Sequence, residues 1–285
     1  MRFFRHGPRG HERAGMVDAR GGHRDLSALL SDFETRHLAS HFASFAAIDP
    51  DKLPLLNETI RIGPPVAAVG KIICIGLNYV DHAREANMEI PAEPVVFMKA
   101  TSSICGPNDD VQLPKDSIKS DWEVELGVVI GREARNVTVE QALSHVAGLC
   151  VINDLSERTF QLERGGQWDK GKSCDTFAPM GPYLVTLDEI ADLADLELWC
   201  DVNGQRVQTG NTRHMIFNVP FLVHYVSQFM SLQPGDIIST GTPPGVGMGR
   251  KPPVWLKAGD EMRLGISGLG QQRQRVRAHI GSANQ

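Results

Sequence analysis

Short apolar runs dominate the pattern of hydrophobic and polar positions after residue 70. They are four to eight residues long, many are rich in Val and Ile, and they lie at residues 71–75, 95–98, 123–130, 148–152, 196–202, 236–239 and 261–266. Runs of this length and composition predict β-strands. Helical periodicity is sparse between them, chiefly at residues 139–147 and 219–230.

The first 65 residues have a different pattern. Phe3 and Phe4, and the apolar residues at 14–17, flank a turn-rich stretch, which predicts a hairpin. Apolar positions then recur every three or four residues between 25 and 47, which predicts short helices. These positions are Leu26, Leu29, Leu30, Phe33 and Leu38. Four prolines between residues 50 and 65 mark a connector.

These patterns together predict an α+β fold that is rich in β-structure. We expect a small N-terminal α/β domain at residues 1–65 and a larger β-rich domain at 66–285. The regular alternation of strands and helices that is typical of a doubly wound sheet is missing from the sequence.

Composition narrows the class of protein. The chain has 285 residues and a net charge of −5, which disfavours a nucleic-acid binder because such proteins usually carry a basic surplus. Its five cysteines are an odd number at irregular spacings, which favours reduced thiols and a cytoplasmic location. The N-terminus is charged and no stretch approaches 18 apolar residues, so we expect neither a signal peptide nor a membrane span.

Two acidic residues interrupt the apolar run at 123–130. In a strand, Glu123 and Glu125 share one face with Cα atoms roughly 6.6 Å apart, while Val124 and Leu126 point to the other face. Burying two carboxylates side by side is costly unless a cation compensates them or one is protonated. The alternative is an amphipathic edge strand with both acids in water.

A third acid, Asp154, ends the apolar run at 148–152. Three carboxylates can supply half of an octahedral shell of oxygen ligands, which suits Mg²⁺ or Mn²⁺. Zinc is less suitable because no His or Cys accompanies the acids at ligand spacing. Asp154 alone could equally be a helix N-cap.

Other polar residues recur at helical spacing. His82 and Glu85 lie three apart, so on a helix they share a face and the carboxylate can orient the imidazole. Arg158 and Gln161 are also three apart, shortly after Asp154. For both pairs the alternative is an exposed helix turn. The glycine-rich stretch at 241–249 lacks the spacings of phosphate-binding loops, which disfavours a nucleotide site.

Several short motifs occur in a fixed order along the chain. They are Gly76-Leu77-Asn78-Tyr79 with His82 and Glu85, Pro94-Val95-Val96-Phe97-Met98-Lys99, Glu123-x-Glu125, Asp154 with Arg158 and Gln161, Lys172-Ser173, and Thr240-Gly241-Thr242-Pro243-Pro244-Gly245-Val246-Gly247. This ordered set resembles the fumarylacetoacetate hydrolase family. Fumarylacetoacetases carry a further Asp near the position of Asn78, so the neutral side chain here is more similar to the three-carboxylate, acylpyruvase-like pattern.

The resemblance implies a mixed β-roll catalytic domain, a bound Mg²⁺ or Mn²⁺, and a homodimer or a dimer of dimers. The residues that it assigns to the metal are Glu123, Glu125 and Asp154. Those that it assigns to catalysis are His82, Glu85 and Lys172, and those that it assigns to the substrate are Arg158, Gln161, Thr242 and Tyr79. His82 and Glu85 would activate water and would lie on a lid-like segment, of which residues 87–94 would be the mobile part. The role of Lys99 stays open.

The implied reaction is hydrolysis of a C–C bond in a β-diketo acid. The run at 153–175 resembles bacterial members that hydrolyse 2,4-diketo-3-deoxy sugar acids of the rhamnonate or fuconate type, which would yield pyruvate and lactate. Glu163, Arg164 and Gln167 could then bind the substrate hydroxyls. The alternatives are an acylpyruvase, an oxaloacetate decarboxylase or a ureidoglycolate lyase. A non-enzyme alternative is a ligand-binding β-protein that a metal stabilises.

Overall fold

The structure is a computed structural model, and it describes the chain except for residues 34–37, 39–43, 46, 86–88 and 280–285. Strands clearly outweigh helices in the described chain, so the predicted β-rich fold is confirmed. The three α-helices with described bounds are α2 (Val80–Glu85), α3 (Asp169–Lys172) and α4 (Val219–Ser227). No helix among the described residues has the length and apolar character that a membrane span needs.

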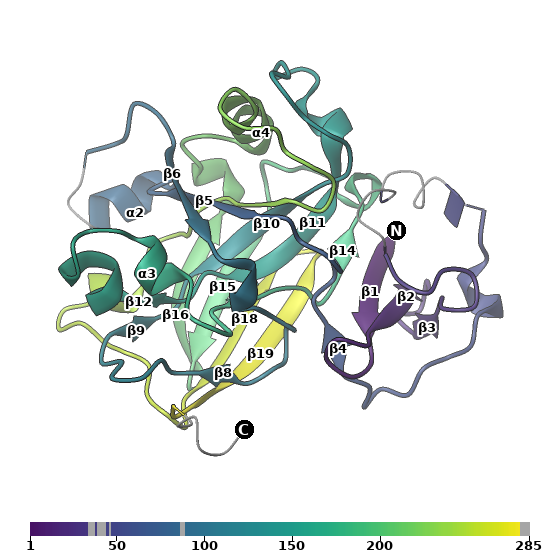
Figure 1. The fold of residues 1–285 in the computed structure, drawn as a ribbon, viewed down its shortest axis with the longest axis horizontal. Coiled ribbons are helices and arrows are strands. Elements are labelled where there is room, and N and C mark those ends of the chain that lie inside the picture. Colours follow the sequence, from purple (N-terminus) through teal and green to yellow (C-terminus); the bar gives the residue numbers. More distant parts are fainter. Residues whose placement is uncertain (34–37, 39–43, 46, 86–88, 280–285) are drawn as a thin grey trace.

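A ten-stranded sheet crosses the molecule (Figure 1). Its order is β3-β2-β1-β14-β11-β10-β17-β5-β6, and β4 pairs with β1. Its strands are β1 (Arg2–His6), β2 (Arg13–Val17), β3 (His23–Asp25), β4 (Ile62–Gly63), β5 (Ile72–Gly76), β6 (Val95–Lys99), β10 (Val124–Ile130), β11 (Val146–Asn153), β14 (Leu184–Val185) and β17 (Ile237–Ser239).

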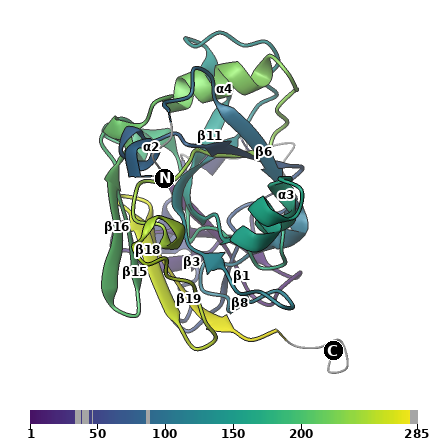
Figure 2. The same cartoon turned by 90° about the vertical axis from the view of Figure 1, so that its left-hand side faces the viewer.

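A second sheet of five strands has the order β16-β15-β18-β19-β8. Its members are β8 (Val111–Gln112), β15 (Glu197–Val202), β16 (Gln205–Asn211), β18 (Glu261–Ile266) and β19 (Gly270–Arg277). Two small ribbons complete the β-structure: β9 (Ser120–Asp121) with β12 (Ser156–Glu157), and β7 (Ile104–Cys105) with β13 (Ala178–Pro179). Figure 2 shows β15 and β16 on one side of the molecule and α3 on the opposite side.

Single turns connect these strands. Turns of 3-10 helix lie at Pro50–Lys52, Thr101–Ser103, Ala142–His145, Leu187–Glu189, Thr212–His214 and Gly247–Gly249, and a π-helical turn lies at Thr159–Glu163.

The main core explains the central strands. Val124, Leu126 and Val128 of β10 point into one apolar cluster with the side chains of the five-stranded sheet, whereas Val129 points into a second cluster on the other face. A strand with both faces buried reads as a continuous apolar run, which is why residues 123–130 carry so strong a signal. Gly127 belongs to this packing, because an added Cβ would lie 2.6 Å from Cδ1 of Ile152.

All seven strands predicted after residue 70 are present. The helix predicted at 219–230 is also present, although it ends at Ser227. The helix predicted at 139–147 is wrong: only one 3-10 turn forms there, because β11 begins at Val146 and pairs that residue with Ile130. Competition from a sheet partner far along the chain overrides local periodicity at this point.

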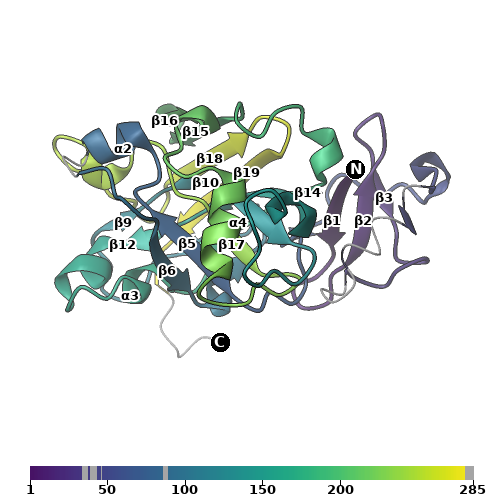
Figure 3. The same cartoon turned by 90° about the horizontal axis from the view of Figure 1, so that it is seen from above.

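The N-terminal hairpin is confirmed as β1 and β2. Of the segment predicted to hold short helices at 25–47, residues 26–33 form turns and bends after β3, whereas residues 38, 44 and 45 are helical. Residues 34–37, 39–43 and 46 lie outside the described residues. β1 continues the main sheet because Phe3 pairs with Leu184 of β14. The boundary at residues 65 and 66 therefore stays a prediction. Figure 3 shows β1 to β3 at one end of the molecule and α2 and α3 at the other.

Candidate active site

The three predicted metal ligands converge. The antiparallel register of β10 and β11 pairs Val124 with Asn153, so Glu123 and Asp154 are the next opposite pair, and the N–H of Asp154 donates to the carbonyl of Glu123 at 2.9 Å. Glu125 lies on the same face as Glu123 because side chains alternate along a strand. One carboxylate oxygen from each acid lies within 4.8 Å of the others.

All three acids are buried, which excludes the alternative of an edge strand with its acids in water. β10 lies between β11 and β17 in the middle of the sheet. Asp154 is followed by the strand β12 rather than by a helix, so it is not an N-cap. The cost of this burial must be met by cations or protons nearby.

Three buried cations contact the acids. Nζ of Lys172 lies 2.6 Å from Oε2 of Glu123 and 2.6 Å from Oδ2 of Asp154. Nζ of Lys99 lies 2.6 Å from Oδ1 of Asp154, and a guanidinium nitrogen of Arg158 lies 2.6 Å from Oε1 of Glu123. Lys99 also donates to the backbone at residue 155 and is buried, which makes it an internal partner of Asp154.

The three cations contact Glu123 and Asp154 but not Glu125, and this difference affects the pKa values of the acids. Burial alone would raise the pKa of Glu123, but the charges of Lys172 and Arg158 outweigh it and lower the pKa to about 2. Glu125 has no such partner: burial and then the charges of Asp154 and Glu123 raise its pKa to about 8. Its Oε2 accepts hydrogen bonds from the hydroxyl of Ser239 at 2.6 Å and from the N–H of Gly241 at 3.0 Å. Glu125 is therefore the acid whose charge is least compensated.

The chemistry of this donor set suits a divalent cation. The three acids supply hard oxygen ligands, and each carboxylate keeps at least one oxygen lone pair that its hydrogen bonds do not use. Burial raises the pKa of Glu125, and the negative charges of Asp154 and Glu123 raise it further, so a cation beside the three acids would stabilise all of them in the charged form. Glu123, Glu125 and Asp154 are the residues that would hold the ion.

Arg158 and Gln161 are both buried, so the alternative of an exposed turn is wrong. Arg158 donates to Oε1 of Gln161 at 3.0 Å, and Gln161 lies in the π-helical turn Thr159–Glu163. An added Cβ at Gly171 would lie 2.6 Å from the backbone nitrogen of Gln161, so only glycine lets α3 pack this closely. Among the described residues, the side-chain amide nitrogen of Gln161 has no hydrogen-bond partner and remains available to a ligand.

A pocket opens above the acidic cluster. Its polar lining consists of His82, Glu123, Glu125, Arg158, Gln161, Lys172 and Thr242. The rest of the wall, apart from Gly76, is apolar or aromatic and consists of Ile75, Leu77, Phe97, Leu162, Trp168 and Met248. Phe97 and Trp168 pack edge to face with ring centroids 5.2 Å apart, and Nζ of Lys172 lies 5.1 Å from the centroid of Phe97. Leu77 adopts a left-handed backbone conformation with φ of 53°, which is unusual for a non-glycine residue and often marks a functional site.

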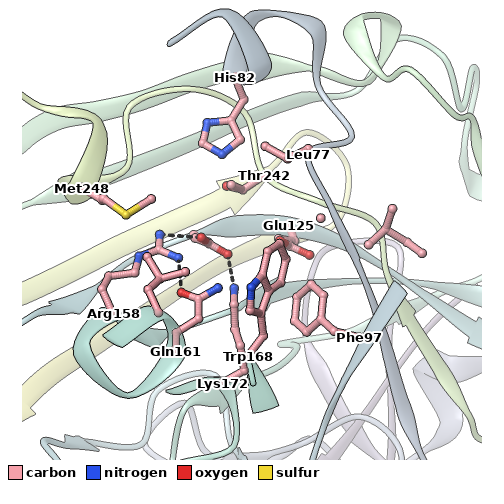
Figure 4. Close-up of a pocket in the computed structure, with 14 residues that line it drawn as sticks. Leu77, His82, Phe97, Glu125, Arg158, Gln161, Trp168, Lys172, Thr242 and Met248 are labelled. Carbon is pink, nitrogen blue, oxygen red and sulfur yellow. Dashed lines mark hydrogen bonds and ion pairs between the residues drawn. The ribbon is translucent and has the colours of Figure 1, made fainter. Parts of the chain in front are cut away.

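The predicted pair of His82 and Glu85 lies at the mouth of this pocket. Nδ1 of His82 is 3.3 Å from Oε2 of Glu85, and the Glu85 carboxylate accepts a hydrogen bond from the N–H of Gly245 at 3.1 Å. Burial alone would raise the pKa of Glu85, but the hydrogen bonds from His82 and Gly245 lower it. Figure 4 shows the imidazole pointing from α2 into the pocket, opposite Gln161 and Lys172. Of the predicted lid at 87–94, residues 87 and 88 lie outside the described residues.

The two remaining predicted substrate contacts, Tyr79 and Thr242, lie in different places. Tyr79 is fully buried and lines a different cleft, behind Pro243 and Pro244, rather than the pocket above the acids. Thr242 does line the pocket, but its hydroxyl donates to the carbonyl of Val124 at 2.9 Å and accepts from Gln208 at 2.8 Å. Its proton is therefore used by the fold, and it can only accept a further hydrogen bond from a ligand.

The glycine-rich stretch forms a tight loop against the acids. Gly245 has φ of 105°, and an added Cβ would lie 1.9 Å from the carbonyl oxygen of Val207. Gly241 has φ of 99° and donates its N–H to Glu125. Glycine is required at both positions because other residues rarely adopt these angles. Several N–H groups of the loop thus bind carboxylates of the protein itself.

Sequence reasoning missed Asp121 and the apolar walls. Asp121 is fully buried and binds Arg158 through two hydrogen bonds. Its signal was its position two residues before Glu123, which places both on the same side if the strand continues. Phe97 and Trp168 gave no comparable signal, since aromatic residues in a strand or helix usually indicate core packing.

Comparisons with known proteins decide the family. The family model described as fumarylacetoacetate (FAA) hydrolase C-terminal matches residues 71–277. The chain belongs to the fumarylacetoacetate hydrolase family. A protein of Burkholderia cenocepacia (strain HI2424), provisionally named a hydrolase, is 59% identical over 279 residues, which cover 97% of this chain and 99% of the relative.

Two solved structures are similar over nearly the whole chain. Fumarylacetoacetate hydrolase from Exiguobacterium antarcticum is 37% identical with a TM-score of 0.86, and the match covers 98% of this chain and 100% of that one. Maleylpyruvate hydrolase from Sphingobium sp. SYK-6 is 30% identical with a TM-score of 0.81 and the same coverage. The β-rich fold of this fumarylacetoacetate hydrolase family member matches that of its neighbours.

Membership of the family sets the class of activity. Its enzymes are hydrolases and isomerases, and they typically use a divalent metal. The cluster of Glu123, Glu125 and Asp154 can hold such an ion. The narrower resemblance to the sugar acid hydrolases stays a prediction.

Proposed function

We propose that this protein is a metal-dependent hydrolase that cleaves a C–C bond of a 2,4-dioxo acid and releases pyruvate. The observation that carries the proposal is one pocket whose lining includes Glu123 and Glu125 of the acidic cluster, which could hold a metal ion, and also His82, which contacts Glu85. The first feature suits a chelating 2-oxo acid and the second suits activation of water.

The charges favour an anionic substrate. Four buried carboxylates face three buried cations around the pocket: Asp121, Glu123, Glu125 and Asp154 against Lys99, Arg158 and Lys172. A divalent ion added to this set would make the group positive as a whole. Such a site favours a carboxylate ligand, since a buried charge needs a partner of opposite sign. A 2-oxo acid carries that carboxylate next to the carbonyl that chelates the ion.

The bound ion would act as a Lewis acid that stabilises negative charge on the 2-oxo group. The protein supplies the proton transfers. Because Nδ1 of His82 is directed to Glu85, Nε2 is the nitrogen that accepts a proton from water, and the oxygen of that water adds to the C4 carbonyl. The C3–C4 bond then breaks, its electron pair stays on C3, and C3 takes back a proton. The products are pyruvate and the acid derived from C4.

Two groups of the chain are placed to stabilise the developing negative oxygen. The side-chain amide of Gln161 has a free N–H, and Lys172 carries a fixed positive charge at the floor of the pocket. Preorganised donors of this kind contribute more in a buried site than they do in water. Arg158 holds Gln161 and Glu123 in place and so sets the geometry of both.

Two kinds of substrate tail beyond C4 fit the proposed class. The sequence resemblance suggests a 2,4-diketo-3-deoxy sugar acid of the rhamnonate or fuconate type, with lactate as the second product. Glu163, Arg164 and Gln167, which were expected to bind its hydroxyls, are exposed and do not line the pocket. The apolar walls favour a shorter tail with fewer hydroxyls, as in an acylpyruvate. Both substrates belong to the proposed class.

The test is pyruvate release from a panel of acids. The panel holds 2,4-dioxopentanoate, oxaloacetate and the two C5 enantiomers of 2,4-diketo-3-deoxyrhamnonate, each with Mg²⁺, with Mn²⁺ and with excess chelator. The L enantiomer is also the acid that L-fuconate yields, because C5 is its only stereocentre. We expect metal-dependent pyruvate release from at least one of the three 2,4-dioxo acids. Turnover of oxaloacetate alone would instead identify a decarboxylase. No turnover of any acid, together with unfolding on chelation, would support the alternative of a metal-stabilised binding protein.

Oligomeric state and location stay predictions. The expected homodimer or dimer of dimers can be checked by light scattering of the purified protein. The expected cytoplasmic location rests on the five cysteines, all of which are free thiols in the structure.

A further inference from the structure

Asp121 has no part in the chemistry described above, yet it is fully buried beside the acidic cluster. Its Oδ1 accepts hydrogen bonds from the N–H groups of Trp122 at 2.9 Å and Gly247 at 2.6 Å. Its Oδ2 accepts from the N–H of Met248 at 3.0 Å and from two nitrogens of Arg158 at 2.9 and 2.7 Å. One carboxylate therefore joins the glycine-rich loop to the guanidinium that contacts Glu123, one of the three acids that would hold the ion.

Local structure explains this placement. The ribbon of β9 and β12 pairs Asp121 with Ser156, so Arg158 follows two residues later on the same side. Gly247 approaches from the loop, where an added Cβ would lie 2.0 Å from the carbonyl of Val254 and 2.8 Å from Oδ1 of Asp121. Only glycine allows the backbone N–H to come this close to the carboxylate.

Asp121 affects the site through its contact with Arg158. A guanidinium is a rigid planar fork, so fixing one edge fixes the direction of its other nitrogens. Asp121 binds Nε and one terminal nitrogen, and the remaining contacts go to Oε1 of Glu123 and Oε1 of Gln161. Without Asp121, the guanidinium could turn and bind both oxygens of Glu123, which would withdraw that carboxylate from the ion and leave Gln161 unheld.

We infer that Asp121 is a positioning residue, which keeps Arg158 from pairing fully with Glu123 and holds the loop at Met248 against the pocket. The part of this inference that concerns turnover rests on the proposed function. The part that concerns metal and ligand binding does not.

A buried carboxylate elsewhere provides a matched control. Asp236 is also buried. It accepts hydrogen bonds from the backbone N–H groups of Lys71 and Gln233, two where Asp121 has three, and from one cation, the ammonium of Lys71. It does not line the pocket. Asp236→Asn should therefore reproduce the structural cost of Asp121→Asn without its effect on the site.

The experiment compares Asp121→Asn, Asp236→Asn and the parent protein in the full chain. Thermal unfolding, calorimetric binding of Mn²⁺, binding of oxalate to the Mn²⁺-loaded protein, and kcat and KM are measured for each. Oxalate is the probe because it mimics the planar chelating part of pyruvate enolate. We expect Tm to fall in both variants. In Asp121→Asn alone, Mn²⁺ and oxalate should bind about tenfold to 100-fold more weakly, the range typical of partners that orient metal ligands.

A double-mutant cycle tests the route through Arg158. In an Arg158→Met background, Asp121→Asn should weaken Mn²⁺ binding by no more than about twofold, because its target is gone. If Asp121→Asn cannot be obtained folded, Arg158→Lys serves instead, since lysine keeps the charge but cannot make the two-bond contact with Asp121. It should lose oxalate binding to a similar extent.

Two results would overturn the inference. One is that Asp121→Asn lowers Tm as Asp236→Asn does but leaves Mn²⁺ and oxalate binding within about twofold of the parent protein. The other is an undiminished effect of Asp121→Asn in the Arg158→Met background. If no dioxo acid is turned over by the parent protein, the proposed function fails, but the metal and oxalate measurements still decide the role of Asp121.

Discussion

Replacing Lys172 by methionine removes the one cation that contacts two of the three acids. Its Nζ contacts Glu123 and Asp154 at 2.6 Å each, and its side chain is 3% exposed. Methionine retains nearly the same length without the charge. Loss of one partner from a buried ion pair typically costs about 3 to 5 kcal/mol, because the other charge stays buried without compensation. We therefore expect Lys172→Met to be less stable than the parent by about that amount when chelator is present.

The same variant should respond more strongly to metal. Lys172 competes with a divalent ion for the oxygens of Glu123 and Asp154, so its removal should tighten Mn²⁺ binding. An ion present at 100 times its dissociation constant adds about 2.7 kcal/mol to the free energy of unfolding, and each further tenfold gain in affinity adds about 1.4 kcal/mol. Mn²⁺ should thus raise the stability of Lys172→Met by more than it raises that of the parent.

Urea unfolding followed by circular dichroism measures both effects, once with chelator and once with excess Mn²⁺. Lys170→Met is the control, because Lys170 lies in the same helix but is exposed and donates only to a backbone carbonyl at 2.7 Å. It should behave like the parent under both conditions. An unchanged midpoint for Lys172→Met with chelator, or a Mn²⁺ response no larger than that of the parent, would refute the claim that Lys172 balances the acids.

Three further predictions concern the other residues of the site. His82→Ala should lower kcat by about 100-fold to 10,000-fold in steady-state kinetics. Its Tm and its Mn²⁺ affinity in calorimetry should stay near the parent values, because the imidazole contacts Glu85 and none of the three acids. Retained turnover would remove His82 from the mechanism. Glu125→Gln should weaken Mn²⁺ binding in calorimetry. With chelator present it should stabilise the protein against urea, because it removes the least compensated of the buried charges. A loss of stability would contradict this account. With chelator present, the parent protein should lose stability as pH rises from about 4.5 toward 8. The raised pKa of Glu125 makes the folded state bind more protons than the unfolded state in that range. Urea midpoints at pH 5 and pH 8 test the sign, and Glu125→Gln should make the stability depend less on pH.

Much of the framework was readable from the sequence. Strands that are buried on both faces must be continuous apolar runs, so β10 and β11 stand out from any neighbour. Charged residues are rare in such runs, which made Glu123, Glu125 and Asp154 conspicuous as candidates for a common site. The i, i+3 spacing likewise predicted the contact of His82 with Glu85, because helical geometry is local.

The tertiary structure decided what long-range packing controls. A helix at 139–147 gave way to β11, since its residues find a strand partner that no local window contains. Tyr79 lines a different cleft, and the hydroxyl of Thr242 donates its proton to the backbone carbonyl of Val124, although both residues lie in motifs of the family. Asp121 gained its contacts from a loop about 125 residues away.

The balance of charge is the clearest division between the two. The sequence by itself determined that several acids and cations would be present, and that the acids of one strand would share a face. Which cation neutralises which acid depends on distances of a few ångströms between segments far apart in the chain, and a buried charge is stabilised or penalised on that scale. For that reason the compensation of Glu123 by Lys172 and Arg158, and the lack of it at Glu125, belong to the tertiary structure alone.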